Sequence, residues 1–166
     1  MRPHVDGLRA RGFEAAAIDL PKRRAEDAVP AYLGASGEGP DVAIGGHSYG
    51  GRVASLLAAG IDGHEHDFGA LILLSYPVHR PGHPEWEPRT RHWEQIRCPV
   101  LFLSGESDPF ARIELLREAV AARLPSARLV TYPRLGHGLL PVLDDALDQV
   151  AAFLRDLAVS GPSGRG

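Results

Sequence analysis

The pentapeptide at residues 46–50, Gly-His-Ser-Tyr-Gly, constrains the fold more than any other part of the chain. It fits the pattern Gly-x-Ser-x-Gly and lies between an apolar run at residues 41–44 and a helix-forming run at residues 52–59. This setting predicts a strand that turns sharply into a helix and presents Ser48 on a strained turn, called a nucleophile elbow. Because such a turn is tight, we expect that side chains at the two glycine positions would collide with the neighbouring strand or helix.

Apolar runs typical of short buried strands alternate with helix-forming segments along the rest of the chain. The predicted strands are residues 13–20, 41–44, 70–75, 99–104 and 127–132, and the predicted helices are residues 3–11, 23–33, 52–59, 113–124 and 142–157. Strands that alternate with helices imply right-handed crossovers and a parallel sheet that is covered on both faces. We therefore predict an α/β fold, a three-layer sandwich with a parallel sheet of about five strands.

Three reactive side chains follow three of the predicted strands. Ser48 comes after the second strand, Asp108 after the fourth and His137 after the fifth. Ligands gather at the carboxyl ends of the strands in a parallel α/β sheet, so these loops are expected to meet at one site. A serine hydroxyl is a weak nucleophile unless a histidine accepts its proton and a carboxylate orients that histidine. The three residue types therefore indicate acyl-transfer chemistry, with Glu106 as the alternative acid if Asp108 only caps a turn.

Length, composition and charge limit the other classes of function. A chain of 166 residues predicts one domain at residues 1–158, and the polar residues 159–166 are predicted to form a disordered tail. A net charge of -3 argues against recognition of nucleic acid by bulk positive charge, and we interpret the basic run at residues 22–24 as a solvated helix start. The single cysteine, Cys98, excludes an internal disulfide, and no apolar run is long enough to cross a membrane. A cytoplasmic protein is expected.

The segment at residues 76–95 has four prolines and no usable period, which indicates the wall or lid of a pocket or a surface loop packed by its own aromatic side chains. We take His47, Tyr76 and His79 as candidate pocket residues. Residues 64–67, His-Glu-His-Asp, have metal-binding side chains but are interpreted as solvent-facing, so no metal is expected. No phosphate-binding or dinucleotide-binding glycine motif is present in the sequence, and no cofactor is expected.

The chain resembles an α/β-hydrolase of the small, dienelactone-hydrolase-like kind over approximately residues 13–157. The resemblance rests on residues 46–52, 75–82, 105–110 and 136–137, and on the chain order Ser, Asp, His. It implies an α/β-hydrolase-like fold with Ser48 as nucleophile, Asp108 as acid and His137 as base. It also implies that the backbone N–H of Tyr49, the residue after the nucleophile, is one donor of the oxyanion hole.

The resemblance is incomplete at the N-terminus. In the complete fold, the first strands and a loop with the second oxyanion donor precede the helix with which this chain begins, so we interpret the domain as N-terminally truncated. Losing one oxyanion donor typically costs about 3 kcal/mol of transition-state stabilisation, so weak activity is expected.

Two hypotheses for the function remain open at the level of the sequence. The first is a serine hydrolase acting on an ester, thioester or similarly activated carbonyl of a small molecule, without a nucleic-acid or membrane partner. The alternative is a non-catalytic, hydrolase-like binding or interaction module, because a fold does not guarantee a function. The sequence leaves the oligomeric state open.

Overall fold

The structure, a computed structural model, describes residues 1–160. The chain divides into two compact units: a larger one, Ile18–Leu139, and a smaller one that joins Met1–Ala17 to the described part of Leu140–Gly166. The organisation of residues 1–158 as a single domain stays a prediction.

The larger unit is built on a sheet of four parallel strands in the order β1-β2-β3-β4. The strands are β1 (Gly39–His47), β2 (Phe68–Leu74), β3 (Val100–Gly105) and β4 (Arg128–Tyr132). Because neighbouring strands are parallel, their carboxyl ends lie along one edge of the sheet. The predicted parallel α/β fold is confirmed, and the four strands agree with four of the five predicted ones.

The fifth predicted strand, residues 13–20, does not form. This segment has no secondary structure, and several of its residues, including Glu14 and Asp19, are exposed. Its apolar Ile18 and Leu20 nevertheless pack against the core of the larger unit. A strand needs a neighbouring backbone with which to share hydrogen bonds. In the described part of the chain β1 pairs only with β2, and residues 13–20 pair with no strand.

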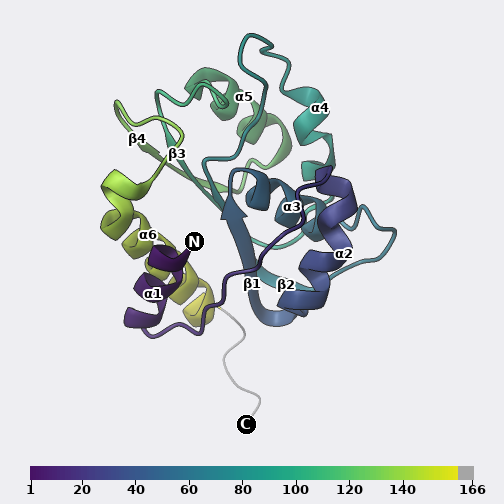
Figure 1. Cartoon of the computed structure of the whole chain (residues 1–166), viewed down its shortest axis with the longest axis vertical. Coiled ribbons are helices and arrows are strands. Elements are labelled where there is room, and N and C mark those ends of the chain that lie inside the picture. Colours follow the sequence, from purple (N-terminus) through teal and green to yellow (C-terminus); the bar gives the residue numbers. More distant parts are fainter. Residues whose placement is uncertain (161–166) are drawn as a thin grey trace. The chain divides into compact units, whose positions relative to one another are not determined.

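The larger unit has one helix before its first strand, α2 (Ala25–Ser36), and helices in each of the three connections between strands. The connecting helices are α3 (Tyr49–Ala58), the short α4 (Glu87–Thr90) with the 3-10 helix η1 (Arg91–Gln95), and α5 (Ile113–Arg123). α3 lies against β1 and β2, and α2 packs on α3 (Figure 1). α2 continues through Pro30, which lies inside the helix. Because β1, β2 and β3 are parallel and each is followed by a helix, the connections that leave these three strands all begin at the carboxyl edge of the sheet.

Both faces of the central strands are buried. Leu71, Leu73 and Phe102 belong to the core that includes Val53 of α3. The alternate positions, Ile72, Leu74, Leu101 and Leu103, are also less than a tenth exposed. Side chains alternate between the two faces of a strand, so burial of both sets explains why β2 and β3 are continuous apolar runs.

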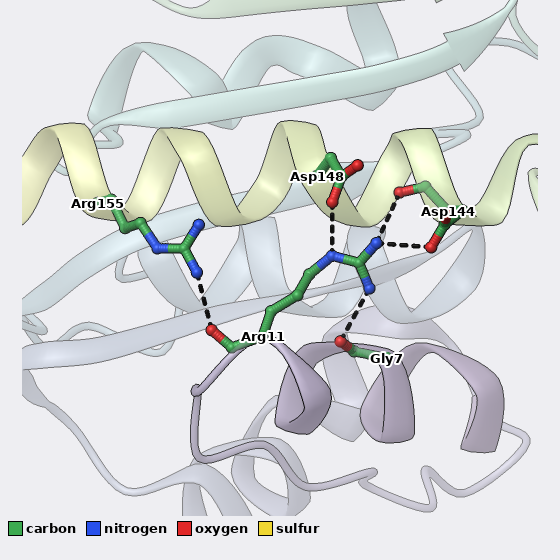
Figure 2. A network of polar contacts seen from close by, with 5 residues as sticks. All are labelled: Gly7, Arg11, Asp144, Asp148 and Arg155. Atoms are coloured by element: carbon green, nitrogen blue, oxygen red, sulfur yellow. Dashed lines mark hydrogen bonds and ion pairs between the residues drawn. The ribbon is translucent and has the colours of Figure 1, made fainter.

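The smaller unit consists of α1 (Arg2–Ala10), the 3-10 turn η2 (Leu140–Val142) and α6 (Leu143–Ser160). Figure 2 shows how Arg11, just after α1, joins the two helices: its guanidinium donates to Asp144 at 2.6 Å and to Asp148 at 2.7 Å. Arg155 of α6 donates in turn to the backbone carbonyl of Arg11 at 2.8 Å. The two helices are therefore tied by polar contacts at the end of α1.

The end of α6 overlaps the predicted tail. The helix continues through Ser160, so the first two residues of the segment predicted to be disordered are helical. The rest of that predicted tail, residues 161–166, lies outside the described residues. Among residues 1–160, no helix combines the length and the apolar character that crossing a bilayer requires.

His92 of η1 is a buried polar side chain in the larger unit, and it is only 6% exposed. Its Nε2 lies 2.8 Å from the hydroxyl oxygen of Ser55, which itself donates to the carbonyl of Arg52 at 2.8 Å. The serine oxygen therefore accepts a hydrogen bond from the neutral imidazole. Burial first, and then the nearby positive charge of Arg52, lower the pKa of His92 from 6.5 to about 4.

We expect His92 to make the fold sensitive to acid. Because its pKa is lower in the folded state, the unfolded chain binds the proton more tightly, and stability present above pH 6.5 is lost as the pH falls toward 4. The expected loss attributable to this group is about 2 kcal/mol at pH 5. Chemical denaturation should show that the free energy of unfolding decreases more between pH 7 and pH 5 in the wild type than in His92→Gln. The exposed His83→Gln variant is the control and should show the same decrease as the wild type. An equal decrease in all three proteins would contradict the role of His92.

Candidate active site

Ser48 occupies a strained turn between β1 and α3. Its φ of 52° and ψ of -113° lie in a region that residues with a side chain rarely adopt. The backbone N–H of Ser48 donates to the carbonyl of Leu74 at 2.8 Å, and its own carbonyl accepts from the N–H of Arg52 at 3.0 Å. The turn is therefore fastened to the end of β2 on one side and to the first turn of α3 on the other.

The two glycines of the pentapeptide differ in their surroundings. A Cβ atom at Gly46 would lie 2.6 Å from the carbonyl carbon of Gly50 and 2.8 Å from the backbone nitrogen of Gly51, both in α3. No atom lies within 4 Å of a Cβ atom built at Gly50. The expected collision therefore exists at position 46, and the prediction for position 50 is wrong. The reason is that β1 passes close beside the start of α3 at Gly46, whereas Gly50 faces open space.

His137 connects Ser48 to Asp108. Its Nε2 lies 2.8 Å from the hydroxyl oxygen of Ser48, and its Nδ1 lies 2.8 Å from a carboxylate oxygen of Asp108. The Asp108 side chain is completely buried, and its other oxygen accepts a hydrogen bond from the N–H of Phe110 at 2.8 Å. Because a carboxylate can only accept, Nδ1 carries the proton and Nε2 is free to accept the proton of Ser48. This arrangement can increase the nucleophilicity of the serine.

The loop that carries His137 is held close to the end of β3. A Cβ atom at Gly105 would lie 2.2 Å from the carbonyl oxygen of Leu135, and the N–H of Ser107 donates to the same oxygen at 2.8 Å. His47 fixes the loop from the other side, because its Nε2 lies 2.8 Å from the carbonyl oxygen of His137. His47 was predicted to be a pocket residue, and the structure places it against the backbone of His137.

Glu106, the alternative acid, points away from the imidazole. Its carboxylate accepts hydrogen bonds from the hydroxyl of Thr131 at 2.8 Å and from Arg117 at 3.4 Å. No described contact joins it to His137. The carboxylate beside His137 is therefore that of Asp108.

Tyr76 and His79, the other two candidate pocket residues, are part of the protein interior. Tyr76 is 1% exposed and packs its ring against Trp93 and Phe102, while His79 is 2% exposed. The Nε2 of His79 accepts a hydrogen bond from the N–H of Arg112 at 3.0 Å, so it joins this segment to the loop after Asp108. Both side chains are buried, and their role as pocket residues stays a prediction.

The lining of the cavity beside Ser48 includes four arginines that the sequence did not single out. The cavity has a volume of about 340 Å³, and Arg23, Arg52, Arg80 and Arg89 line it together with Ser48 and Tyr49. Arg80 and Arg89 belong to the long segment at residues 76–95, so this segment does form one wall. Arg23 comes from the basic run that was interpreted as a solvated helix start. No pattern in the sequence indicated that these four arginines meet.

His66, one of the histidines considered for a metal site, contacts carboxylates through both ring nitrogens. Its Nδ1 lies 2.7 Å from Glu38 and its Nε2 lies 2.9 Å from Asp62. Burial of the ring lowers its pKa, but the hydrogen bonds to Glu38 and then Asp62 outweigh this effect and raise the pKa above 6.5. The two carboxylates therefore favour the protonated form of the ring.

Comparison with known proteins identifies relatives at the level of the fold. A family model described as "Alpha/beta hydrolase domain" matches residues 21–150. No curated protein sequence matches the chain significantly. A solved monoacylglycerol lipase from Paleococcus ferrophilus is similar with a TM-score of 0.69 and 12% identity, over 93% of this chain and 88% of the lipase.

Two further solved structures are larger than this chain. An uncharacterized protein from Bacillus cereus has a TM-score of 0.66 and 16% identity over 93% of this chain and 55% of its own. A predicted CIB-like hydrolase from Thermoplasma acidophilum has a TM-score of 0.60 and 19% identity over 80% of this chain and 58% of its own. This chain thus spans little more than half the length of these two proteins.

Proposed function

The chain belongs to the α/β-hydrolase domain family, and from that premise we propose that it is a serine hydrolase for an ester, thioester or similarly activated carbonyl of a small molecule. The observation that carries the proposal is the continuous line of hydrogen bonds from Ser48 through His137 to Asp108. The dienelactone-hydrolase-like subtype remains a prediction, because the family match reaches only the superfamily.

In the proposed reaction, the hydroxyl oxygen of Ser48 attacks the carbonyl carbon while the Nε2 of His137 takes its proton. Asp108 keeps the imidazole in the tautomer that can accept this proton, and it stabilises the imidazolium that results. The imidazolium then protonates the leaving group, and an acyl-enzyme remains on Ser48. A water molecule, deprotonated by the same nitrogen, hydrolyses the acyl-enzyme and restores the serine.

The backbone N–H of Tyr49 is the proposed oxyanion donor. Tyr49 is the first residue of α3, and the first N–H groups of a helix have no carbonyl partner within the helix. That N–H can therefore be used by the oxygen that becomes negative in the transition state. We assign no second donor among the described residues. One such donor typically contributes about a hundredfold or more in rate, so we propose slow turnover for a site that relies on the N–H of Tyr49 alone.

Labelling with a fluorophosphonate probe tests the proposal directly. The wild-type chain should become labelled, and mass spectrometry should locate the adduct on the peptide that contains Ser48. Ser48→Ala should remove the label, because the probe reacts with an activated serine hydroxyl. Ser36→Ala is the matched control, because this serine lies at the end of α2 and outside the cavity, and it should label as the wild type does.

The same experiment separates the two classes of function. A folded wild-type chain that never becomes labelled and never hydrolyses p-nitrophenyl acetate would favour the non-catalytic binding or interaction module. Equal labelling of Ser48→Ala and the wild type would exclude Ser48 as the nucleophile.

A further inference from the structure

The cavity beside Ser48 concentrates positive charge. Four of its lining side chains are arginines, and no aspartate or glutamate lines it. The whole chain has a net charge of -3, so this surface differs in sign from the protein as a whole. Guanidinium groups repel one another, and gathering them costs folding energy unless an anion compensates.

The arginines are only partly neutralised by the protein. Arg52 pairs with Glu26 at 2.9 Å through Nη2, but its Nη1 is buried without a hydrogen-bond partner among the described residues. Arg89 donates from its guanidinium to the backbone carbonyl of Pro77 at 3.2 Å, which supplies no negative charge. Partial burial, and then the positive charges of Arg52 and Arg80, lower the pKa of Arg89. The guanidinium groups of Arg52 and Arg89 therefore still have N–H donors that can bind an acceptor.

Two buried rings hold the backbone that carries these arginines. The hydroxyl of Tyr76 donates to the carbonyl of Arg89 at 2.9 Å, and the Nδ1–H of His79 donates to the carbonyl of Arg80 at 2.8 Å. The tautomer of His79 is fixed, because its Nε2 accepts from the N–H of Arg112 at 3.0 Å. The backbone of Arg80 and Arg89 is therefore already fixed before a ligand binds, so binding has to order less of the chain and its entropic cost is lower.

We propose that the arginines form a subsite for an anionic group, a carboxylate or a phosphate, on the ester or thioester that Ser48 attacks. The inference rests on the proposed hydrolase function and adds the class of substrate. Guanidinium groups bind both anions through paired hydrogen bonds. Ser48 lines the same cavity. One substrate can therefore place its anionic group against the arginines and its carbonyl carbon beside Ser48, and binding of the anion orients the carbonyl for attack.

A matched pair of esters tests the subsite. Mono-p-nitrophenyl glutarate has a free carboxylate, whereas its ω-methyl ester has the same carbon chain without the charge. We expect the wild type to prefer the anionic ester at least tenfold in kcat/KM. In Arg80→Gln and in Arg89→Gln this preference should fall about tenfold, and Arg89→Lys should recover part of it because the charge is retained. The exposed Arg97→Gln, which lies outside the cavity lining, should keep the wild-type preference.

Isothermal titration of the wild type with monomethyl glutarate and with inorganic phosphate gives a readout that needs no catalysis. Binding that weakens about tenfold in Arg89→Gln supports the subsite, and the tighter of the two ions identifies the anionic group. Equal cleavage of the two esters together with no binding of either ion would overturn the inference and leave the hydrolase proposal intact. Absence of labelling and hydrolysis, with ion binding retained, would instead reject the hydrolase and keep the anion site.

Discussion

Asp108→Asn should lower hydrolysis of an activated ester by about 10⁴-fold while leaving the chain folded. The Oδ1 of Asp108 accepts from the N–H of Phe110, so the amide oxygen of an asparagine would take that position. The amide NH₂ would then face the Nδ1 of His137, 2.8 Å away. A donor there forces Nδ1 to accept, so the proton moves to Nε2, which can no longer accept the proton of Ser48. Steady-state kinetics, with thermal unfolding as a check of the fold, measures this effect.

Glu106→Gln is the control for that experiment. Glu106 is also an acid of the turn after β3, but its carboxylate contacts Thr131 and Arg117. We expect its replacement to change the rate less than twofold. A large loss in Glu106→Gln together with a small loss in Asp108→Asn would show that the structure has assigned the wrong acid.

Gly46→Ala should destabilise the fold by about 3 kcal/mol. The added methyl group would lie 2.6 Å from the carbonyl carbon of Gly50 and 2.8 Å from the nitrogen of Gly51. Both are backbone atoms of α3, so no side-chain rotation can relieve the contact and the helix itself must move. Because Ser48 lies on the turn between β1 and α3, labelling by the fluorophosphonate probe should decrease as well. Chemical denaturation measures the free energy of unfolding.

Gly50→Ala provides the matched control within the same motif. No atom lies within 4 Å of the added Cβ, and the residue is in the first turn of α3. Alanine is a better helix former than glycine by up to about 1 kcal/mol, so the variant should be as stable as the wild type or slightly more stable. Equal destabilisation of the two variants would contradict the close approach of β1 and α3.

The strained turn at Ser48 and the placement of Ser48, Asp108 and His137 after successive strands were predictable because both depend on local sequence. An apolar run, two glycines around Ser48 and a helix-forming run specify a strand, a turn and a helix. Asp108 and His137 each follow an apolar strand, and parallel strands bring their carboxyl ends to one edge. The structure accordingly brings Ser48, His137 and Asp108 within hydrogen-bonding distance.

Residues 13–20 show where local patterns are insufficient. Their composition is that of a strand, but a strand forms only beside a partner that supplies hydrogen bonds. No described strand other than β2 pairs with β1. The segment therefore contributes Ile18 and Leu20 to the core without entering the sheet.

By itself, the sequence determined the alternation of strands and helices, the strained turn at Ser48 and the residue types for acyl transfer, because each depends on neighbours in the chain. Only the tertiary structure decided which side chains surround the serine. It turned Tyr76 and His79 into the core, where they hold the backbone of the arginines, and it gathered Arg23, Arg52, Arg80 and Arg89 around one cavity. These arginines come from separate segments, so their meeting depends on packing between elements, and no local pattern encodes it.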